Sequence, residues 1–385
     1  EDLRDARGGF YSARDADSEG EEGTFYLWSP QEVEEALGAE AAALFSRAYG
    51  VTPEGNFEGK NILNLQGGLD PLAKSEGVSL DELDASLETA RIAMKEARSA
   101  REQPFRDEKV LTSWNSFVSR ALAEAGGALG RVDYVEAARE NAEFILQELF
   151  QNGRLLRSWK DGDSRIPGFL EDYAGLGNAL LTLYETTLEP RWVEEAERLS
   201  HLVLHLFWDD EEGIFFDSPR DGERLVVRAR EIMDNATPSG NSLAVEFLIR
   251  MAALGDRQDL RRVAERVLNR EIDGVAKFPS AFGRLLSALT LCWAPPTEVV
   301  ILGNPGSPEF RDLLATAHGD FNPSRVVAGG DPGSLPPLPI LKGREAVGDR
   351  ATAFVCRDFT CSLPVHTPEE LRRELEGAQG KLSGF

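Results

Sequence analysis

Four short polar segments in this 385-residue chain combine carboxylates with aromatic, amide or hydroxyl side chains. They are RDADSEGEEG (14–23), RDEKVLTSWN (106–115), GFLEDYAGLGN (168–178) and MDNATPSGNS (233–242). Paired carboxylates can act as general acid and general base, and aromatic faces can stack on the apolar face of a sugar ring. Each segment precedes or opens a predicted buried helix or hairpin, so together they indicate carbohydrate-type chemistry at the helix starts.

The candidate acid and base are Asp172 together with Asp107 or Asp234. Substrate contacts are expected from nine further residues of the same segments: Asp15, Asp17, Lys109, Trp114, Asn115, Glu171, Tyr173, Ser239 and Asn241. Aspartate and serine are also favoured helix N-caps, so a purely structural role remains the alternative for each residue.

No metal or cofactor is expected. His201 and His205 are four residues apart and share one helix face, which is a spacing that zinc sites use. That face also has charged residues such as Glu194 and Glu197 and lies opposite the apolar stripe, so we interpret it as a solvated outer surface.

The helices that must position these residues recur as pairs. The first helix of each pair is small and apolar on nearly all sides, which predicts complete burial; these helices lie in 114–130, 172–188 and 240–256. The second is amphipathic, as in 133–150 and 191–208. Buried inner helices alternating with half-exposed outer helices are typical of an α/α toroid, in which all inner-helix starts meet at one end.

The sequence predicts a mainly α fold, an incomplete (α/α)6 toroid, over residues 1–294. Only about four helix pairs can be counted, whereas a closed ring of this kind has roughly six. From Pro295 proline and glycine become frequent, and a small α/β segment is predicted over 295–385. Cys356 and Cys361 flank a turn in that segment and are expected to be reduced structural thiols, because their spacing is not that of a redox or zinc pair.

The formal net charge of -24 disfavours nucleic acid and anionic membrane surfaces as partners. No apolar run is long enough to span a bilayer, and three cysteines are too few for a disulfide framework. We therefore expect a soluble, cytoplasmic protein.

Several segments resemble one family specifically. They are GGFYSARDADSEGEEGTFYLW (8–28), GNFEGKNIL (55–63), DEKVLTSWN (107–115), LEDYAGL (170–176), DNATPSGNS (234–242) and FVCRDFTCSLPV (354–365). In this order they are similar to the YyaL-type thioredoxin domain-containing proteins, the spermatogenesis-associated protein 20-like family. The resemblance implies a thioredoxin-like domain upstream of a helical toroid similar to six-hairpin glycosidases and N-acylglucosamine 2-epimerases. We expect that domain, and the first toroid helices, to lie outside these residues and to be a partner of this chain.

Two functions follow. The first is a glycosidase-like or sugar isomerase-like domain that binds a sugar or glycoconjugate at the toroid mouth. Similarity to the epimerases would imply ring histidines, but none of the four histidines opens an inner helix, so carboxylate chemistry is favoured. The alternative is a non-catalytic binding or scaffold module that serves an attached thioredoxin-like domain.

Overall fold

The computed structural model describes residues 2–65, 67–224, 226–293, 296–357 and 360–379. The chain divides into two compact units, one formed by 12–108 and the other by 1–11 together with 109–385. Each unit has its own hydrophobic core.

The smaller unit, 12–108, has four helices and two short strand pairs in its described ranges 12–65 and 67–108. The helices are α1 (Pro30–Leu37), α2 (Ala39–Tyr49), α3 (Leu69–Glu76) and α4 (Leu80–Ser99). The strands are β1 (Ala13–Arg14), β2 (Asp17–Ser18), β3 (Glu21–Glu22) and β4 (Arg106–Asp107), with β1 antiparallel to β4 and β2 to β3. Val33, Phe45, Leu83 and Leu87 lie in its core. Capping boxes Ser29–Glu32 and Ser79–Glu82 start α1 and α4, because each serine and glutamate satisfies the other's free backbone N–H.

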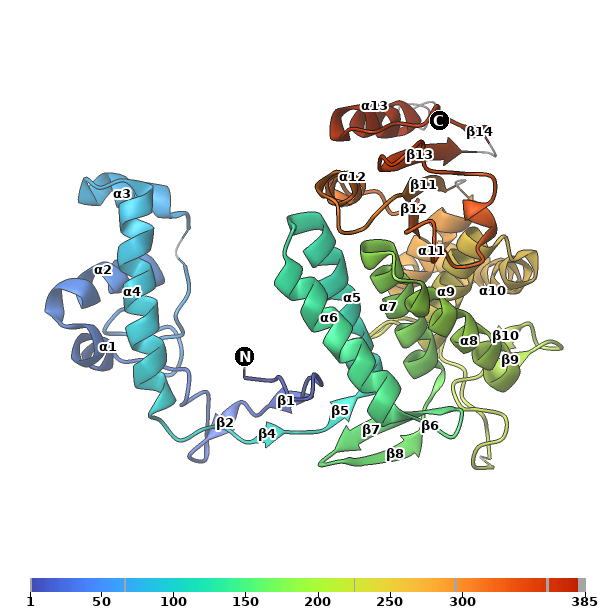
Figure 1. Cartoon of the computed structure of the whole chain (residues 1–385). Helices are drawn as coiled ribbons and strands as arrows, with labels where there is room; N and C mark the ends of the chain where they lie inside the picture. The colour runs from blue at the N-terminus through green and yellow to red at the C-terminus, as the bar shows by residue number, and fades with distance from the viewer. Residues whose placement is uncertain (1, 66, 225, 294–295, 358–359, 380–385) are drawn as a thin grey trace. The chain divides into compact units, whose positions relative to one another are not determined.

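The larger unit is built from helix pairs (Figure 1). The inner helices are α5 (Thr112–Leu129), α7 (Leu170–Thr187), α9 (Gly240–Gly255) and α11 (Gly283–Trp293). The outer helices are α6 (Val132–Phe144, continued by a π-helical turn Ile145–Leu149), α8 (Pro190–Phe207) and α10 (Gln258–Lys277). Each inner helix packs on the next, α5 on α7, α7 on α9 and α9 on α11, and each of the first three also packs on its outer partner. The predicted incomplete α/α toroid is confirmed: the described helices form an arc of three pairs and a seventh helix.

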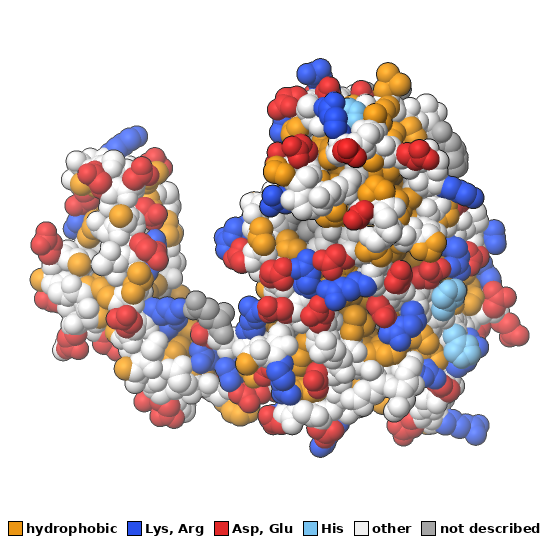
Figure 2. Space-filling model, viewed as in Figure 1, with side chains coloured by type: hydrophobic (Ala, Val, Ile, Leu, Met, Phe, Trp, Pro, Cys, Tyr) orange, Lys and Arg blue, Asp and Glu red, His pale blue; other side chains and the backbone are white. Residues whose placement is uncertain are grey.

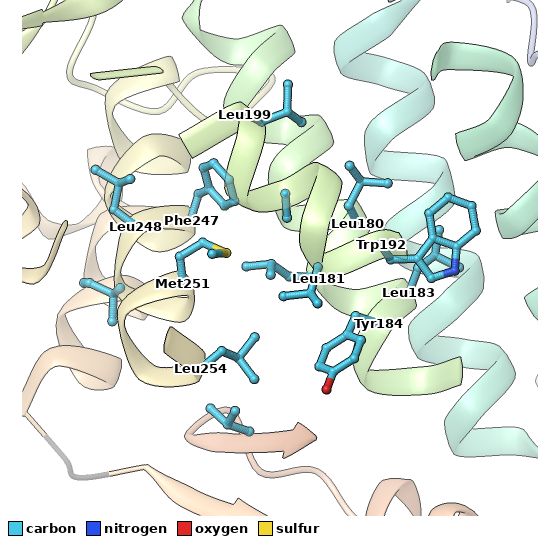
Figure 3. Packing of buried hydrophobic residues seen from close by; sticks show 14 of the residues in the cluster. Leu180, Leu181, Leu183, Tyr184, Trp192, Leu199, Phe247, Leu248, Met251 and Leu254 are labelled. Carbon is cyan, nitrogen blue, oxygen red and sulfur yellow. The ribbon is translucent and has the colours of Figure 1, made fainter. Parts of the chain in front are cut away.

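Burial follows the predicted difference between the two helix types. Fifteen of the eighteen residues of α7 are buried, whereas α8 buries one stripe that includes Trp192, Ala196 and Leu199. Figure 3 shows the core between α7 and α9, where Leu181 lies close to Phe247 and Met251.

Short strands connect the helices at the end of the arc where the inner helices begin. They are β5 (Val110–Leu111), β6 (Phe150–Gln151), β7 (Arg154–Lys160), β8 (Asp163–Pro167), β9 (Trp208–Asp209) and β10 (Ile214–Phe215). β7 pairs antiparallel with β5, β6 and β8, and β9 pairs with β10.

The C-terminal α/β segment forms as predicted. Its strands are β11 (Thr297–Leu302), β12 (Arg325–Gly330), β13 (Thr352–Arg357) and β14 (Thr360–Cys361), and its helices are α12 (Pro308–His318) and α13 (Pro368–Gln379). The sheet order is β12-β11-β13-β14, with β11 parallel to β12 and the other pairs antiparallel. The crossover helix α12 permits the parallel pair.

The structural units differ from the domains 1–294 and 295–385 that the sequence predicts. The sheet shares one core with the helical arc. The Tyr184 hydroxyl of α7 accepts a hydrogen bond from the Gly329 N–H of β12 at 3.3 Å, and the half-buried His318 ring lies 2.9 Å from the Glu185 carbonyl oxygen. The composition changes at Pro295, but the hydrophobic core continues across this point. Residues 295–385 therefore belong to the same unit as 109–293.

The expectation of reduced thiols at Cys356 and Cys361 is wrong in this structure. The β13–β14 register places the two cysteines directly opposite each other, and they form a disulfide. Sequence spacing alone does not reveal this pairing, because it depends on a hairpin that brings residues five apart together. Cys292 is a free thiol.

No helix in the described ranges is long and apolar enough to cross a membrane. On the face of the larger unit seen in Figure 2, acidic and basic side chains are interspersed, although the chain as a whole has a net charge of -24.

The packing of α7 on α9 gives a test of the arc. A Cβ atom on Gly177 would lie 2.4 Å from Cζ of Phe247 and 2.6 Å from its two Cε atoms. We predict that Gly177→Ala lowers the free energy of unfolding by about 1–3 kcal/mol, because the ring must move within a packed core. Urea denaturation measures this difference.

Gly175 is the matched control on the same helix. A Cβ there would meet Ser116 Cβ at 3.5 Å, which is ordinary van der Waals contact. Gly175→Ala should leave stability unchanged or raise it by up to about 1 kcal/mol, because alanine favours helix. Equal losses in the two variants would contradict the packing account.

Candidate functional site

A pocket of about 290 Å³ opens where α7 and α9 begin. We name it the mouth pocket and define it by its lining residues: Arg157, Phe169, Glu171, Asp217, Glu231, Met233, Asn235, Thr237, Pro238, Ser239 and Gly240. It contains three carboxylates, one guanidinium, an aromatic ring and a thioether. Such a set can hydrogen-bond hydroxyl groups and contact an apolar ring face.

One buried asparagine holds the loop that forms one wall of the pocket. The Asn241 side-chain oxygen accepts from the Phe215 N–H at 3.2 Å, and its amide nitrogen donates to the carbonyls of Phe215 and Glu231, both at 3.0 Å. Asn241 is 1% exposed. It therefore positions the loop rather than contacting a ligand.

Asp234 fixes the other end of that loop. Its two carboxylate oxygens accept from the backbone N–H groups of Ser239 at 3.0 Å and Arg284 at 2.7 Å. Ser239 is the N-cap of α9, where its hydroxyl accepts from the Ser242 N–H. Asp234 thus connects the starts of α9 and α11, and it does not line the mouth pocket.

Arg157 of β7 organises the charged side of the pocket. Its Nη1 donates to Glu171 Oε1 at 2.6 Å and to Asp172 Oδ2 at 3.3 Å, and its guanidinium lies 4.9 Å from the centre of the Phe169 ring. Arg157 and Glu171 are each 26% exposed, whereas Asp172 is fully buried. Of these two carboxylates, only that of Glu171 is accessible to a ligand.

Asp172, the principal predicted acid or base, joins two inner helices. Its Oδ1 accepts from the Ser113 N–H of α5 at 3.0 Å, and its Oδ2 accepts from the Phe169 N–H at the start of α7 at 2.8 Å. Burial raises the pKa of Asp172 to about 7, and the neighbouring Arg157 and the two backbone donors only partly offset that rise. In this structure both oxygens are occupied and no solvent reaches them.

Asp217 is one of the three carboxyls that line the mouth pocket. It follows β10, and its Oδ2 accepts from the Glu231 N–H at 2.9 Å. Its Oδ1 has no hydrogen-bond partner among the described residues. Burial raises the pKa of Asp217, and the charges of Glu231 and Glu171 raise it further. A raised pKa makes a carboxyl a better proton donor to a ligand than an ordinary aspartate.

A second pocket of about 210 Å³ continues along the inner helices and shares Pro238 with the mouth pocket. Arg120 and Arg284 line it, and both bind Glu246 of α9. The Arg120–Glu246 pair is bidentate at 2.9 and 3.0 Å. Burial by itself would raise the pKa of Glu246, but these arginines hold it below its usual value. This buried pair fixes the inner face of the arc.

The remaining predicted residues have separate places. Asn115 of α5 is buried, with Oδ1 accepting from the Phe10 N–H at 2.7 Å and Nδ2 donating to the Phe10 carbonyl at 2.9 Å. The Tyr173 hydroxyl accepts from the Leu155 N–H of β7 at 2.9 Å. Trp114 is 43% exposed at the start of α5, and Lys109 is exposed just before β5.

Asp15, Asp17 and Asp107 lie in the unit 12–108. Asp15 and Asp17 are exposed, and Asp107 pairs with Ala13 across β1 and β4. Of the twelve predicted residues, only Glu171 and Ser239 line the mouth pocket.

The histidine pair lies where the sequence predicts, because His201 and His205 are both exposed on the outer helix α8. Within the described part of the chain, no group of three or more histidine, cysteine, aspartate or glutamate side chains has the arrangement of a metal site.

Sequence reasoning missed Arg157, Asp217 and Glu231. All three lie in connecting strands and loops rather than at helix starts. For two of them a signal existed in the short segments GRLLRSW (153–159) and GIFFDS (213–218), where Arg157 and Asp217 interrupt apolar runs. Such a charge next to a buried strand needs a partner or a ligand.

The position of Asp172 gives a stability prediction. In Asp172→Asn one carboxylate oxygen becomes an NH₂ group, which cannot accept from both backbone donors, so the free energy of unfolding should fall by about 1–3 kcal/mol. The folded pKa lies above the unfolded value, so the stability that the protonated Asp172 contributes is complete below about pH 4 and is lost as pH rises through about 7. The gap in melting temperature between wild type and variant should therefore narrow from pH 5 to pH 8.

Glu171→Gln is the matched control at the adjacent position, because that carboxylate is partly exposed and holds no backbone group of a second helix. Its stability should stay within about 0.5 kcal/mol of wild type. A larger loss in Glu171→Gln than in Asp172→Asn would refute the assignment of Asp172 as the joint between α5 and α7.

No protein-family model matches the chain. Among curated proteins, spermatogenesis-associated protein 20 of Rattus norvegicus is 32% identical and that of Homo sapiens 31% identical, each alignment covering 97% of this chain and 52% of the relative. An uncharacterized protein of Caenorhabditis elegans is 28% identical over 94% of this chain and 54% of that protein. The chain thus spans about half the length of the curated relatives that it matches.

Solved structures give weaker likenesses. A sugar epimerase from a ruminal bacterium matches with a TM-score of 0.38 at 13% identity, covering 71% of this chain and 67% of that one. The GH76A α-1,6-mannanase of Salegentibacter sp. HEL1_6 matches with a TM-score of 0.35 at 14% identity, covering 82% and 75%. The sequence alignments, which run along almost the whole chain, support a relationship to the spermatogenesis-associated protein 20 family.

Proposed function

We propose that the larger unit binds a hydroxyl-rich, sugar-type ligand in the mouth pocket, with Asp217 as the acid and Glu171 as its carboxylate partner. The observation that carries the proposal is Asp217, a half-buried carboxyl with a raised pKa in a pocket that has two more carboxylates. Its Oδ1 accepts no hydrogen bond from any residue that the structure describes. In glycoside hydrolysis, two neighbouring carboxyl groups take the acid and the base role because their different environments give them different pKa values.

The proposal moves the acid role from the predicted Asp172, Asp107 and Asp234 to Asp217. Glu171 faces the same pocket and is paired with Arg157, which orients its carboxylate. The Phe169 ring and Met233 supply apolar surface for a ring face.

A non-catalytic binding or scaffold module is the second candidate, serving an attached thioredoxin-like domain. The ion pairs of Arg157 favour this second candidate. They bind Glu171, a carboxylate of the pocket, and the buried Asp172 beside it, so under this alternative neither group is free for catalysis. The relatives are about twice as long as the aligned chain, which leaves room for such a domain in a longer protein.

The test is a panel of monosaccharides and short oligosaccharides examined by saturation-transfer NMR and calorimetry with the 385-residue chain. We expect Asp217→Asn to lower the turnover of a bound sugar by about 10²- to 10⁴-fold with the fold intact. Activity should fall as pH rises through the raised pKa of Asp217, because the acid form is required.

The matched control is Asp221→Asn, an exposed carboxylate outside the mouth pocket that pairs with Arg154. It should leave binding and turnover unchanged. Sugar binding without turnover, insensitive to pH, would favour the scaffold module. Failure of every sugar to bind would overturn the sugar-type ligand itself.

A further inference from the structure

The edge of the C-terminal sheet contains a disulfide that neither candidate function uses. Cys356 of β13 and Cys361 of β14 form it across an antiparallel pair. The two sulfur atoms differ in access: Cys356 is 1% exposed, whereas Cys361 is an exposed residue of the short edge strand. An incoming reagent can therefore approach only the Cys361 side.

An arginine contacts both sulfur atoms. Arg344 Nη2 lies 3.1 Å from Cys356 Sγ and 3.2 Å from Cys361 Sγ. The Arg344 side chain is 15% exposed, and its Nε–H has no hydrogen-bond partner among the described residues. Its nearest carboxylate, Glu298 Oε2, is 3.5 Å away. The guanidinium is thus only loosely paired with Glu298 and lies closer to the sulfur atoms.

A guanidinium in this position stabilises a thiolate more than a disulfide, since only the thiolate is charged. A lower pKa of the leaving thiol makes a disulfide break faster on attack by another thiolate. The arrangement therefore favours exchange at this bond, whereas a purely structural disulfide needs no cation beside it.

We propose that Cys356–Cys361 is a thiol–disulfide exchange site whose co-substrate is a dithiol, with Arg344 stabilising the departing Cys356 thiolate. One thiolate of the dithiol attacks Cys361 Sγ. The Cys356–Cys361 bond breaks, and its electron pair leaves on Cys356 Sγ as a thiolate beside Arg344. The second thiol of the dithiol, after losing its proton, attacks the dithiol's own sulfur in the mixed disulfide and releases Cys361 as a thiolate, which takes up a proton. The dithiol is oxidised to its disulfide, and the protein disulfide is reduced by two electrons.

The experiment uses the full 385-residue chain, dithiothreitol as the dithiol, quenching with N-ethylmaleimide, and tryptic mass spectrometry. Arg357 lies between the two cysteines, so trypsin separates them onto peptides that only the disulfide joins. We expect joined peptides in protein purified without reductant, loss of the link under dithiothreitol while circular dichroism stays native, and return of the link with oxidised dithiothreitol. Cys292 is the internal control, because it is a free thiol outside the sheet.

Two variants test the role of Arg344 in opposite directions. Arg344→Gln should slow reduction at neutral pH by about threefold or more, because the leaving thiolate loses its cation. Glu298→Gln should accelerate reduction, because the guanidinium then has no carboxylate among the described residues competing with the sulfur atoms and keeps only its bond to the Ile340 carbonyl. If Arg344 and Glu298 had only a structural role, both substitutions would loosen the sheet and change the rate of disulfide reduction in the same direction.

If Arg344→Gln does not fold, Arg344→Lys is the substitute variant, because lysine keeps the positive charge. We expect its disulfide to be reduced more slowly than that of the wild type, but by less than the threefold expected for Arg344→Gln. The proposal is overturned if both cysteines are alkylated in oxidised protein, if reduction requires denaturant, or if Glu298→Gln and the arginine variant shift the rate in the same direction.

Discussion

The architecture of this protein depends on how buried backbone groups are satisfied where the inner helices begin. The first N–H groups of a helix have no partner within the helix, and the strands that cross this end of the arc bury further N–H and carbonyl groups. Asn115 and Asn241 solve the problem in the same way, because each side chain accepts from the N–H of a phenylalanine and donates to its carbonyl. Asp172 and Tyr173 satisfy N–H groups of α5, of the residue before α7, and of β7.

This constraint separates the residues that build the pocket from those that face it. Most polar side chains at the inner-helix starts form hydrogen bonds to the backbone of neighbouring strands and loops. A side chain whose oxygen and nitrogen atoms are all bonded in this way cannot also bind a ligand. The groups that remain accessible, Asp217 and Glu231, come from the loop that Asn241 holds in place. Glu171 is the exception at a helix start, because α7 turns it away from the core and toward Arg157.

The sequence reveals the helix pairs because burial on all sides and burial on one stripe produce different patterns of apolar residues. It also identifies the end of the arc where a pocket forms. It does not reveal which polar residue faces solvent there, since Asp172 and Glu171 are adjacent and chemically alike. Only burial and the backbone N–H groups of Ser113 and Phe169, which bind Asp172, distinguish the two carboxylates. The separate core of 12–108 and the pairing of Cys356 with Cys361 were likewise missed, because both arise from contacts that have no periodic signature.

The complete burial of α7 has a consequence for how this protein can change over time. A helix with almost no solvent face has few neutral positions: at Gly177 a larger residue meets Phe247, and a smaller residue at a large apolar position leaves a void. The outer helix α8, in contrast, presents a broad charged face that few contacts constrain. Substitutions should therefore be tolerated more readily on the exposed face of α8 than along α7, and the packing of the inner helices should change more slowly than the outer surface.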